Sequence, residues 1–311
     1  MKNRRVAITG GAGFIGSGLA YELAVNNRVI IIDDLSTGRI ENIAGLIDEE
    51  NVTFIQSSIL DLHLLEEAFN GVDFAFHQAA IPSVPRSIED PLSTNNVNIT
   101  GTLNVLIAAR DSKVKKVIFA SSSSVYGDTP TLPKKEDMTP NPQSPYALTK
   151  LVGEYYCQVF YQIYKLPTVC LRYFNIYGPR QDPNSQYAAV IPIFIARVRQ
   201  DKPPIIYGDG NQTRDFAFVQ DAIRANIIAA ESNATGIFNI GTGGNISING
   251  LAKAVIKIIG RELEPIYQEP SAGDVRDSLA DISKARAIGY EPQYSLEDGL
   301  RETIRRFIDA S

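Results

Sequence analysis

A glycine-rich turn close to the start of the chain restricts the possible folds more than any other segment. Thr9–Gly16 reads TGGAGFIG and joins a short apolar run, Val6–Thr9, to a segment with helical spacing, Phe14–Val25. Its glycines match both the Gly-x-Gly-x-x-Gly and the Gly-x-x-Gly-x-x-Gly pattern. Glycine permits the tight turn and the close backbone approach that a pyrophosphate requires. The pattern predicts a strand, a phosphate-binding turn and a helix, the order used by dinucleotide-binding folds.

An acidic residue follows this turn at the spacing of a nucleotide site. Asp33 ends a second, almost wholly apolar strand, Arg28–Asp33, 17 residues after Gly16. A carboxylate there binds both hydroxyls of an adenosine ribose and repels a 2′-phosphate, and Asp34 adds to the repulsion, so NAD is favoured over NADP. The alternative is that the two acids belong to an ordinary surface turn. The cofactor contacts predicted in these two segments are Gly10, Gly13, Phe14, Ile15, Gly16, Asp33 and Asp34.

Strand-like and helix-like segments alternate through the first half of the chain. Further strands are predicted at Val52–Ile55, Asp73–His77 and Lys116–Ala120, and helices at Leu62–Phe69, Pro91–Arg110 and Pro145–Tyr164. Alternation of this kind implies right-handed βαβ units. We therefore expect an α/β fold, a Rossmann doubly wound parallel sheet, over residues 1–175.

The regularity ends near residue 175. Five prolines interrupt the chain there: Pro179, Pro183, Pro192, Pro203 and Pro204. Helical patterns return at Val219–Ser232, Ile248–Gly260 and Leu296–Ile308. We expect residues 176–311 to form mainly a smaller C-terminal α/β domain that binds the substrate, with part of 213–240 returning to the first domain.

The composition excludes several classes of function. Among 311 residues, 30 Lys+Arg and 35 Asp+Glu give a formal net charge of −5, which gives no reason to expect a nucleic-acid or membrane partner. No run approaches the roughly 18 apolar residues of a membrane span, and no targeting segment is visible. Only two histidines (His63, His77) and two cysteines (Cys157, Cys170) are present, none at metal-ligand spacing. We expect no metal, a reducing cytoplasmic location, and chemistry that uses other groups.

A tyrosine and a lysine four residues apart form the candidate catalytic pair. On a helix, Tyr146 and Lys150 share one face, and a nearby ammonium group lowers the pKa of a phenol. Tyr146 is therefore a candidate general base. Upstream, the serines Ser121–Ser124 follow the predicted strand Lys116–Ala120, at the end of the strand where active-site loops lie. Separately, each feature could be a surface coincidence or a plain polar loop; together they favour a catalytic site.

With these motifs the chain resembles the extended short-chain dehydrogenase/reductase family, and within it the UDP-sugar 4-epimerases. The likeness runs nearly from end to end, through Thr9–Gly16, His77–Ala80, Asn98–Thr102, Ser121–Gly127, Tyr146–Lys150, Arg172–Gly178, Gly208–Asp215 and Gly273–Asp281. Two further segments, Ser83–Ser87 and Arg180–Pro192, are similar to UDP-N-acetylglucosamine 4-epimerases. The resemblance implies an NAD-dependent isomerase of nucleotide-sugar metabolism.

The resemblance also implies a reaction. Tyr146 removes the proton of the sugar O4 while hydride passes from C4 to NAD. Related dehydratases carry an Asp-Glu pair, and related decarboxylases a Glu, where Ser123 and Ser124 stand here. Without an acid, elimination at C5 lacks its catalyst, whereas an epimerase only returns hydride to the opposite face of a 4-keto sugar. We expect 4-epimerisation with NAD retained, and Ser122 as catalytic serine beside Tyr146 and Lys150.

Further site residues follow from the resemblance. Small residues at Ser278, Ala189 and Ser83 favour UDP-GlcNAc and UDP-GalNAc. UDP-glucose and UDP-galactose stay possible substrates, because discrimination by volume is worth only about 1–3 kcal/mol. Further cofactor contacts are expected at Ser58, Ile59, Gln78, Ala79, Ala80, Asn98, Tyr146, Lys150 and Tyr173. Further substrate contacts are expected at Ser122, Ser123, Ser124, Tyr146, Asn175, Val190, Tyr207, Arg214, Asp274 and Arg276.

Three positions depart from the family pattern. Many relatives have Asp at Ser58, which contacts adenine, and Arg at Ser271, which binds phosphate; Arg276 is a candidate to replace the latter. Pro82 stands where relatives have Gly or Lys. The departures therefore concern the adenine end of the cofactor and the edge of the sugar pocket.

The resemblance implies a partner and leaves two other functions open. Helices at Pro91–Arg110 and Pro145–Tyr164 form a two-fold interface in this family, so we expect a homodimer. A UDP-glucuronate 4-epimerase, or another NAD-dependent nucleotide-sugar enzyme, needs a cation near the C6 carboxylate, for which Arg86 is the candidate. A non-catalytic NAD-binding sensor commonly lacks the tyrosine or the lysine, and both are present here.

Overall fold

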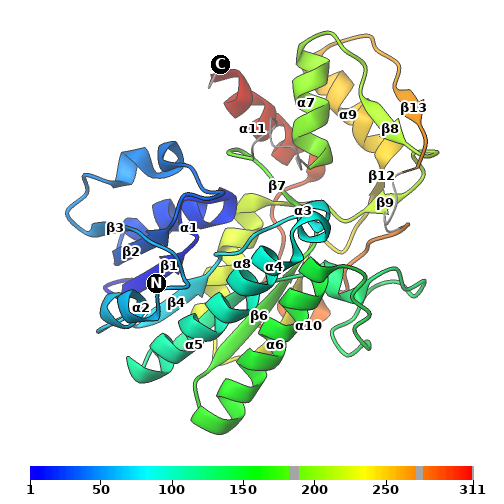
Figure 1. Ribbon diagram of the computed structural model, residues 1–311. Helices are drawn as coiled ribbons and strands as arrows, with labels where there is room; N and C mark the ends of the chain where they lie inside the picture. Colours follow the sequence, from blue (N-terminus) through cyan, green and yellow to red (C-terminus); the bar gives the residue numbers. More distant parts are fainter. Residues whose placement is uncertain (182–188, 271–275, 310–311) are drawn as a thin grey trace.

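A seven-stranded parallel sheet forms the centre of the molecule (Figure 1). The computed structural model describes residues 1–181, 189–270 and 276–309. The strands, in spatial order, are β11 (Gly236–Ile240), β6 (Thr168–Tyr173), β5 (Lys116–Ser122), β4 (Phe74–His77), β1 (Arg5–Thr9), β2 (Arg28–Asp33) and β3 (Val52–Gln56). The sheet confirms the expected α/β class, and β6 and β11 are additional to the strands that the alternation predicts.

Helices cover both faces of this sheet (Figure 1). One face carries α1 (Phe14–Ala24) and α8 (Val219–Glu231); the other carries α2 (Leu62–Ala68), α5 (Gly101–Asp111) and α6 (Pro145–Tyr164). Along β1 the side chains alternate, since Val6 and Ile8 join the core of the first face and Ala7 that of the second. Burial on both faces explains why these strands are continuous apolar runs.

The strand order reverses between β1 and β4. From β1 the sheet extends through β2 and β3 on one side, and from β4 through β5 and β6 on the other. In sheets of this type, ligands bind outside the carboxyl ends of the strands at the reversal. Thr9 and His77 end the two central strands, so the turns that follow them border the expected site.

A π-helical turn interrupts the helix expected over Pro91–Arg110. The chain passes from α4 (Pro91–Asn95) through a π turn, Asn96–Thr100, directly into α5. Such turns occur frequently at functional sites. The shorter helical segments are two 3₁₀ turns, Ile40–Leu46 and Ser123–Tyr126, and the helices α3 (Val84–Glu89) and α10 (Ser283–Arg286).

Beyond β6 the strands are short and pair outside the main sheet. β7 (Ile176–Tyr177) pairs with β10 (Ala217–Phe218), β8 (Ile205–Tyr207) with β13 (Ile266–Gln268), and β9 (Thr213–Arg214) with β12 (Ile246–Ser247). The helices beside these short strands are α7 (Val190–Arg199), α9 (Ile248–Ile259) and α11 (Leu296–Asp309). None of the helices in the described ranges has the length and apolar content needed to cross a membrane.

Helix α7 corrects one expectation from the sequence. Pro192, counted among the residues that interrupt the chain, lies in the first turn of this helix. The first four N–H groups of a helix have no intrahelical acceptor, so a proline there costs no hydrogen bond. Ile191, Phe194 and Ile195 are buried, and their burial stabilises α7.

Candidate active site

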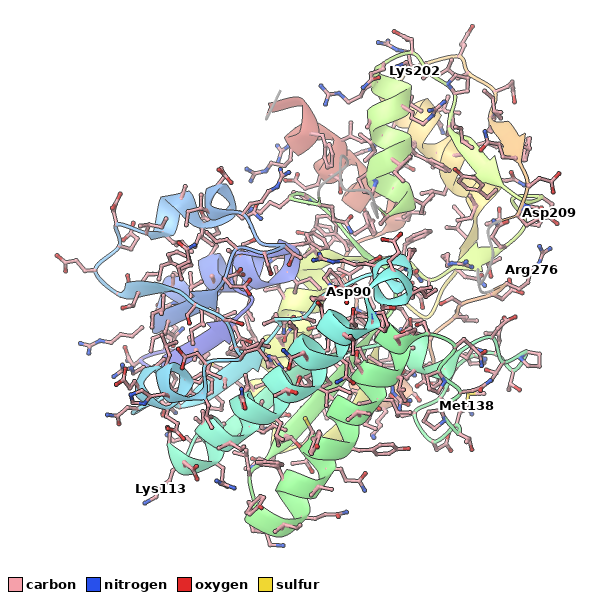
Figure 2. The ribbon with its side chains drawn as sticks, viewed as in Figure 1. Asp90, Lys113, Met138, Lys202, Asp209 and Arg276 are labelled. Carbon is pink, nitrogen blue, oxygen red and sulfur yellow. The ribbon has the colours of Figure 1, made fainter. Side chains whose placement is uncertain are left out.

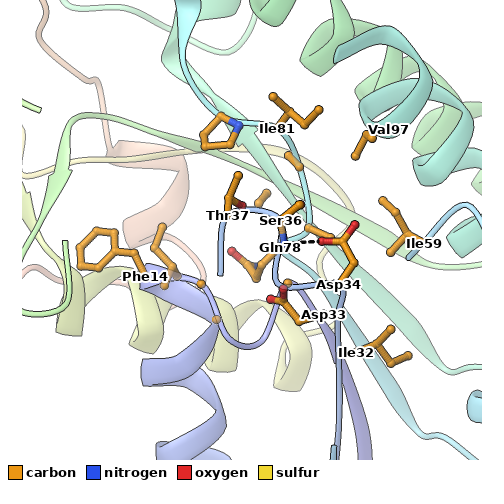
Figure 3. Close-up of a pocket in the computed structure, with 18 of the residues that line it drawn as sticks. Phe14, Ile32, Asp33, Asp34, Ser36, Thr37, Ile59, Gln78, Ile81 and Val97 are labelled. Carbon is orange, nitrogen blue, oxygen red and sulfur yellow. Dashed lines mark hydrogen bonds between the residues drawn. The ribbon is translucent and has the colours of Figure 1, made fainter. Parts of the chain in front are cut away.

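A cavity of about 290 Å³ opens where the strand order reverses (Figure 3). The turns after β1, β2 and β4 line it, together with α6 and the end of β6. Its lining includes most of the expected cofactor residues: Gly10, Gly13, Phe14, Ile15, Gly16, Asp33, Asp34, Ile59, Gln78, Ala79, Ala80, Tyr146, Lys150 and Tyr173. The fold therefore brings together residues that are far apart in the sequence.

Two glycines in the turn after β1 leave no room for a side chain. Gly10 has a φ of +70°, and a Cβ atom on it would lie 2.5 Å from the backbone nitrogen of Ala79. A Cβ atom on Gly16 would collide with the carbonyl oxygen of Gly10. Helix α1 begins after Gly13 without a side-chain cap, so the N–H groups of its first turn are available to an anion. This cradle fits the pyrophosphate of a dinucleotide.

A buried carboxylate borders the same cavity. Asp33 accepts hydrogen bonds from the Ala12 N–H through Oδ2 and from the Leu35 N–H through Oδ1, each at 2.9 Å. Burial raises the pKa of Asp33, although the two backbone hydrogen bonds act against this rise. Asp34, exposed beside it, accepts from the Ser36 N–H at 2.9 Å (Figure 3). The oriented carboxylate suits ribose hydroxyls, so the cradle and the acid together fit NAD.

Two expected cofactor residues lie outside the cavity lining. Ser58 turns its hydroxyl to its own loop, while its neighbours Ser57 and Ile59 line the cavity. Asn98, in the π turn, is 2% exposed and bonds the backbone N–H and carbonyl of Ile81 at 2.8 and 3.1 Å. Asn98 therefore shapes the turn that lines the cavity instead of lining it.

The cavity also includes residues that the sequence did not assign to the cofactor. These are Ile32, Ser36, Thr37, Ser57, Ile81, Pro82, Val97, Ala120 and Ser121. Most of them are sequence neighbours of assigned residues in the same turns. Their position next to an assigned residue is the signal that could have predicted them as cavity residues. Val97 is different, because the π turn brings it to the cavity.

His77 connects two of the surrounding segments. Its Nδ1 lies 2.7 Å from Thr9 Oγ1, and its Nε2 lies 2.9 Å from Thr102 Oγ1. The Thr102 hydroxyl donates to the carbonyl oxygen of Asn98 at 2.6 Å, so it accepts from Nε2–H of the His77 ring. Burial, followed by the charge of Lys150, lowers the pKa of His77 to about 3. His77 is thus a packed strand-end residue that supports the cavity.

A closed ring of three hydrogen bonds supports the cavity beside β6. Gln78 donates to Asn226 Oδ1 at 3.0 Å, Asn226 donates to the Tyr173 hydroxyl at 2.7 Å, and Tyr173 donates to Gln78 Oε1 at 3.3 Å. Burial raises the pKa of Tyr173 to about 12, so its hydroxyl keeps the proton that it donates. Asn226 is fully buried on α8, and no motif in the sequence indicates this role.

The candidate catalytic residues meet at the cavity wall. Tyr146 and Lys150 come from α6, and Ser122 ends β5. Lys150 donates through Nζ to the carbonyl oxygen of Ala120 at 2.8 Å, and its Nζ lies 5.9 Å from the centre of the Tyr146 ring. Ser122 is a hydrogen-bond partner of Tyr146 and accepts from the Ser124 hydroxyl at 2.9 Å. The Tyr146 and Ser122 hydroxyls therefore lie side by side, with the Lys150 ammonium on the same face of α6.

The pKa of Tyr146 differs from the expectation. Burial raises the pKa of Tyr146, and the hydrogen bond with Ser122 only partly opposes this rise. Burial lowers the pKa of Lys150 to about 8. Lys150 is bonded to a backbone carbonyl and faces the tyrosine ring, so in the protein alone it does not produce the expected lowering for Tyr146.

The expected substrate residues form a second group, on the segments after β6. Asn175 donates through Nδ2 to the carbonyl oxygen of Asp215 at 3.1 Å and to Ser278 Oγ at 3.5 Å. Arg214 donates through Nη1 to the carbonyl oxygen of Arg276 at 3.3 Å. The structure thus brings Asn175, Arg214, Arg276 and Ser278 together through short contacts.

Arg276 forms a two-bond ion pair with Asp209 at the surface (Figure 2). Its two terminal nitrogens each donate to one carboxylate oxygen at 3.1 Å. The hydrogen bonds from Arg276 lower the pKa of Asp209 to about 2. Arg276 therefore uses two of its five N–H donors on this carboxylate. Tyr207, two residues before Asp209, is 50% exposed.

The remaining expected substrate residues occupy loop and helix ends. Ser83 precedes α3 and accepts from the Arg86 N–H at 3.4 Å. Ser123 and Ser124 lie in the 3₁₀ turn, Ala189 directly precedes α7, and Val190 is its first residue. Asp274 and Ser271 lie outside the described residues. Within the described ranges, His, Cys, Asp and Glu side chains form no group of three or more that could hold a metal ion.

Comparison with known proteins identifies close relatives. The model of the NAD dependent epimerase/dehydratase family matches residues 6–241. The UDP-glucose 4-epimerase of Mycolicibacterium smegmatis is 38% identical over 313 residues, which cover 99% of each chain.

Two solved structures share the whole fold. A UDP-N-acetylglucosamine 4-epimerase from Methanobrevibacter ruminantium M1, in complex with UDP-N-acetylmuramic acid, has a TM-score of 0.97 and 43% identity and covers 100% of both chains. A UDP-glucose 4-epimerase from Thermotoga maritima, with UDP-glucose, has a TM-score of 0.94 and 39% identity over 98% of this chain and 99% of that one.

Proposed function

The chain belongs to the NAD dependent epimerase/dehydratase family, and we propose that it is an isomerase that inverts C4 of a UDP-hexose. One observation carries this choice within the family. The loop that brings Ser122 to Tyr146 continues with Ser123 and Ser124 and offers no carboxylate for elimination or decarboxylation. The similarity to three proteins named as 4-epimerases or solved as such supports the same reaction.

The roles of the chain's own residues follow from their positions. The turn Gly10–Gly16 and Asp33 would hold NAD in the cavity, and the cofactor would supply the hydride acceptor and donor for the sugar C4. Tyr146 takes the proton of the O4 hydroxyl and later gives it back, so the net reaction is an isomerisation. Ser122 orients the O4 hydroxyl toward Tyr146. Lys150, held by a backbone carbonyl, adds positive charge beside the tyrosine below its pKa of about 8.

The proposed substrates are UDP-GlcNAc and UDP-GalNAc, with UDP-glucose and UDP-galactose as further substrates. Ser278, Ala189 and Ser83 are small, and Ser278 lies beside Asn175 in the second group of site residues. A small residue at Ser278 leaves room for an N-acetyl group. The 43% identity to a UDP-N-acetylglucosamine 4-epimerase supports this preference.

A homodimer is part of the proposal. Helices α3 and α4 pack against α6, and exposed apolar side chains gather on these helices: Ile88, Leu92, Leu148, Tyr155 and Val159. Apolar side chains concentrated on adjoining helices are typical of a protein interface. Light scattering should give twice the chain mass of 34.1 kDa. The double variant Leu92→Asp/Tyr155→Asp should be monomeric, and a monomeric wild-type protein would contradict the proposal.

The proposal also assigns the two parts of the chain. Residues 1–175 with part of 213–240 would bind NAD, and residues 176–311 mainly the UDP-sugar. Strand β11 supports the return of 213–240, because it pairs with β6 in the main sheet. The two cysteines, Cys157 and Cys170, are buried and unbridged, which suits a cytoplasmic location.

An epimer assay tests the function. The protein is incubated with NAD and, separately, with UDP-GlcNAc, UDP-glucose and UDP-glucuronate, and the C4 epimers are separated by chromatography. We expect conversion of UDP-GlcNAc to UDP-GalNAc and slower conversion of UDP-glucose. Conversion of UDP-glucuronate alone would favour the alternative in which Arg86 faces the sugar carboxylate. If no sugar is converted, the protein is not an epimerase of these substrates.

A further inference from the structure

A buried ion pair lies behind the loop that carries Ser122. The side chains of Glu154 on α6 and Arg172 on β6 are each 1% exposed. Glu154 Oε1 accepts from Arg172 Nε at 2.8 Å and Oε2 from Nη2 at 2.7 Å. Burying two charges is costly, and such pairs are often no more stabilising than apolar residues of similar volume. Stability is therefore a weak explanation for this pair.

Glu154 also holds the residue that precedes Ser122. Its Oε1 accepts a hydrogen bond from the Ser121 hydroxyl at 2.5 Å. One helical turn earlier, Lys150 donates to the carbonyl oxygen of Ala120 at 2.8 Å. Helix α6 therefore holds two successive residues at the end of β5, immediately before the catalytic serine.

Arg172 holds the opposite end of the same loop. Its guanidinium carbon lies 4.6 Å from the centre of the Tyr126 ring, and Tyr126 ends the 3₁₀ turn Ser123–Tyr126. Arg172 Nη1 finds no other hydrogen-bond acceptor among the described residues, and the Tyr126 side chain packs against the guanidinium. The Tyr126 hydroxyl donates to Asn239 Oδ1 at 2.7 Å, which anchors the ring to β11. Burial acts to lower the pKa of Arg172, but Glu154 outweighs it and raises that pKa.

We propose that Glu154 and Arg172 are positioning residues for the reaction. By holding Ser121 and Tyr126 they fix both ends of the loop that carries Ser122, and with it the direction of the catalytic hydroxyl. Neither side chain lines the cavity, so both act through the loop. The inference rests on the proposed epimerase function, in which the Ser122 hydroxyl must face the reacting oxygen.

Ser121→Ala tests the link, because it removes the hydroxyl and leaves the ion pair intact. We expect kcat to fall about tenfold, since a small misplacement of a catalytic group slows the reaction strongly. KM for the UDP-sugar, the NAD content and the melting temperature should stay close to wild type. A purely structural role would instead lower the melting temperature or the NAD content and leave kcat per loaded enzyme unchanged.

Glu154→Gln provides the second arm, because Glu154 lies outside the cavity. It should lower kcat by a similar factor. The double variant Ser121→Ala/Glu154→Gln should be no slower than the slower single variant, because both changes act on the loop through the Ser121–Glu154 hydrogen bond. Thr168→Val is the matched control. The Thr168 hydroxyl donates to the Cys157 carbonyl oxygen at 2.9 Å. This bond also links β6 to α6, but at a distance from the loop, so its loss should leave kcat unchanged.

Three results would overturn the proposal. One is a Ser121→Ala enzyme whose kcat, at full NAD content, stays within twofold of wild type. Another is a lower kcat in Ser121→Ala with an unchanged kcat in Glu154→Gln, which would make Ser121 a cofactor contact. The third is a double variant whose kcat falls by the product of the two single-variant factors. If Glu154→Gln does not fold, Ser121→Ala decides alone, and an inactive wild-type protein would refute the epimerase function instead.

Discussion

The cofactor cavity and the expected substrate residues are built in opposite ways. Around the cavity the polar groups are buried and already bonded within the protein, as for Asp33 with two backbone donors and His77 between two threonines. In the substrate segments Tyr207 is half exposed, and Arg276 is paired with Asp209 at the surface. Burial holds the first group in place before a ligand arrives, whereas Tyr207 and Arg276 in the second are exposed and held by few contacts. The difference predicts a preformed cofactor cavity beside an adaptable region that contains the expected substrate residues.

The largest effect should come from Tyr146, at the wall of the cofactor cavity. Tyr146→Phe removes the proton-transfer group, so kcat should fall about a thousandfold, within the range of general acid–base catalysis. Fold and NAD content should be unchanged, because the ring still fills its place. Epimer formation and the NAD released on denaturation measure the two effects. A fully active variant would refute Tyr146 as the base.

One glycine near the cofactor cavity and one in the later segments test how closely each region is packed. Gly16→Ala forces a Cβ against the carbonyl oxygen of Gly10, whereas a Cβ on Gly244 meets only Thr242 Oγ1 at 3.6 Å. NAD affinity should fall about a hundredfold in Gly16→Ala, since overpacking of a tight site costs about 1–3 kcal/mol. Gly244→Ala should bind NAD as wild type does. Equal NAD titrations for the two variants would break the comparison.

The pH dependence of stability probes the buried network at His77. Folded His77 binds a proton only near pH 3, whereas the unfolded residue binds one below its ordinary pKa of 6.5. Stability is therefore lost as the pH falls below 6.5. Between pH 6.5 and 5 the wild type should lose about 2 kcal/mol more than His77→Asn, at about 1.4 kcal/mol per pKa unit. Urea unfolding at both pH values measures the difference, and parallel pH slopes would contradict it.

Substrate choice should respond to a single residue in the adaptable region. Ser278→Tyr fills the space proposed for the N-acetyl group, so kcat/KM for UDP-GlcNAc should fall about tenfold relative to UDP-glucose. Ser278→Ala removes the hydroxyl without adding volume and should keep the wild-type ratio. Competition assays with both sugars give the ratio directly. An unchanged ratio in Ser278→Tyr would remove Ser278 from the sugar pocket.

The smallest effect is expected at the surface ion pair. Arg276→Ala should raise KM for the UDP-sugar about threefold with kcat unchanged, because exposed charges contribute little. Asp209→Asn releases Arg276 for the phosphates and should lower KM by a similar factor. Initial rates over a range of UDP-sugar concentrations separate KM from kcat. A raised KM in Asp209→Asn would show that the ion pair itself shapes the site.

Local sequence patterns were sufficient to predict several helices, strands and turns of this molecule. The turn Thr9–Gly16, the helices α1, α6 and α9 and the acid-terminated strand β2 lie where the sequence predicts them. Each depends on a backbone requirement or an apolar period that neighbouring residues express directly. Helix α7 escaped prediction because Pro192 breaks a helix in most positions but not in the first turn.

Side-chain direction was predicted less well than side-chain location. Asn98 and Ser58 lie next to the cavity, yet Asn98 points to the Ile81 backbone and Ser58 to its own loop. Lys150 lies on the expected face of α6, but its ammonium bonds a carbonyl group and does not lower the pKa of Tyr146. A sequence places a residue on a helix face; only its surroundings determine the direction of its polar atoms.

The order of the residues alone was enough to infer an NAD-binding α/β fold and a Ser/Tyr/Lys site, because each signal lies within a short segment. Contacts between distant segments needed the folded chain. The Gln78–Asn226 hydrogen bond spans 148 residues, and the Glu154–Arg172 pair joins α6 to β6. Such contacts arise because packing two elements together buries polar groups that must then find partners in each other. Which partners they find depends on the geometry of the packed layers, and no local pattern carries that information.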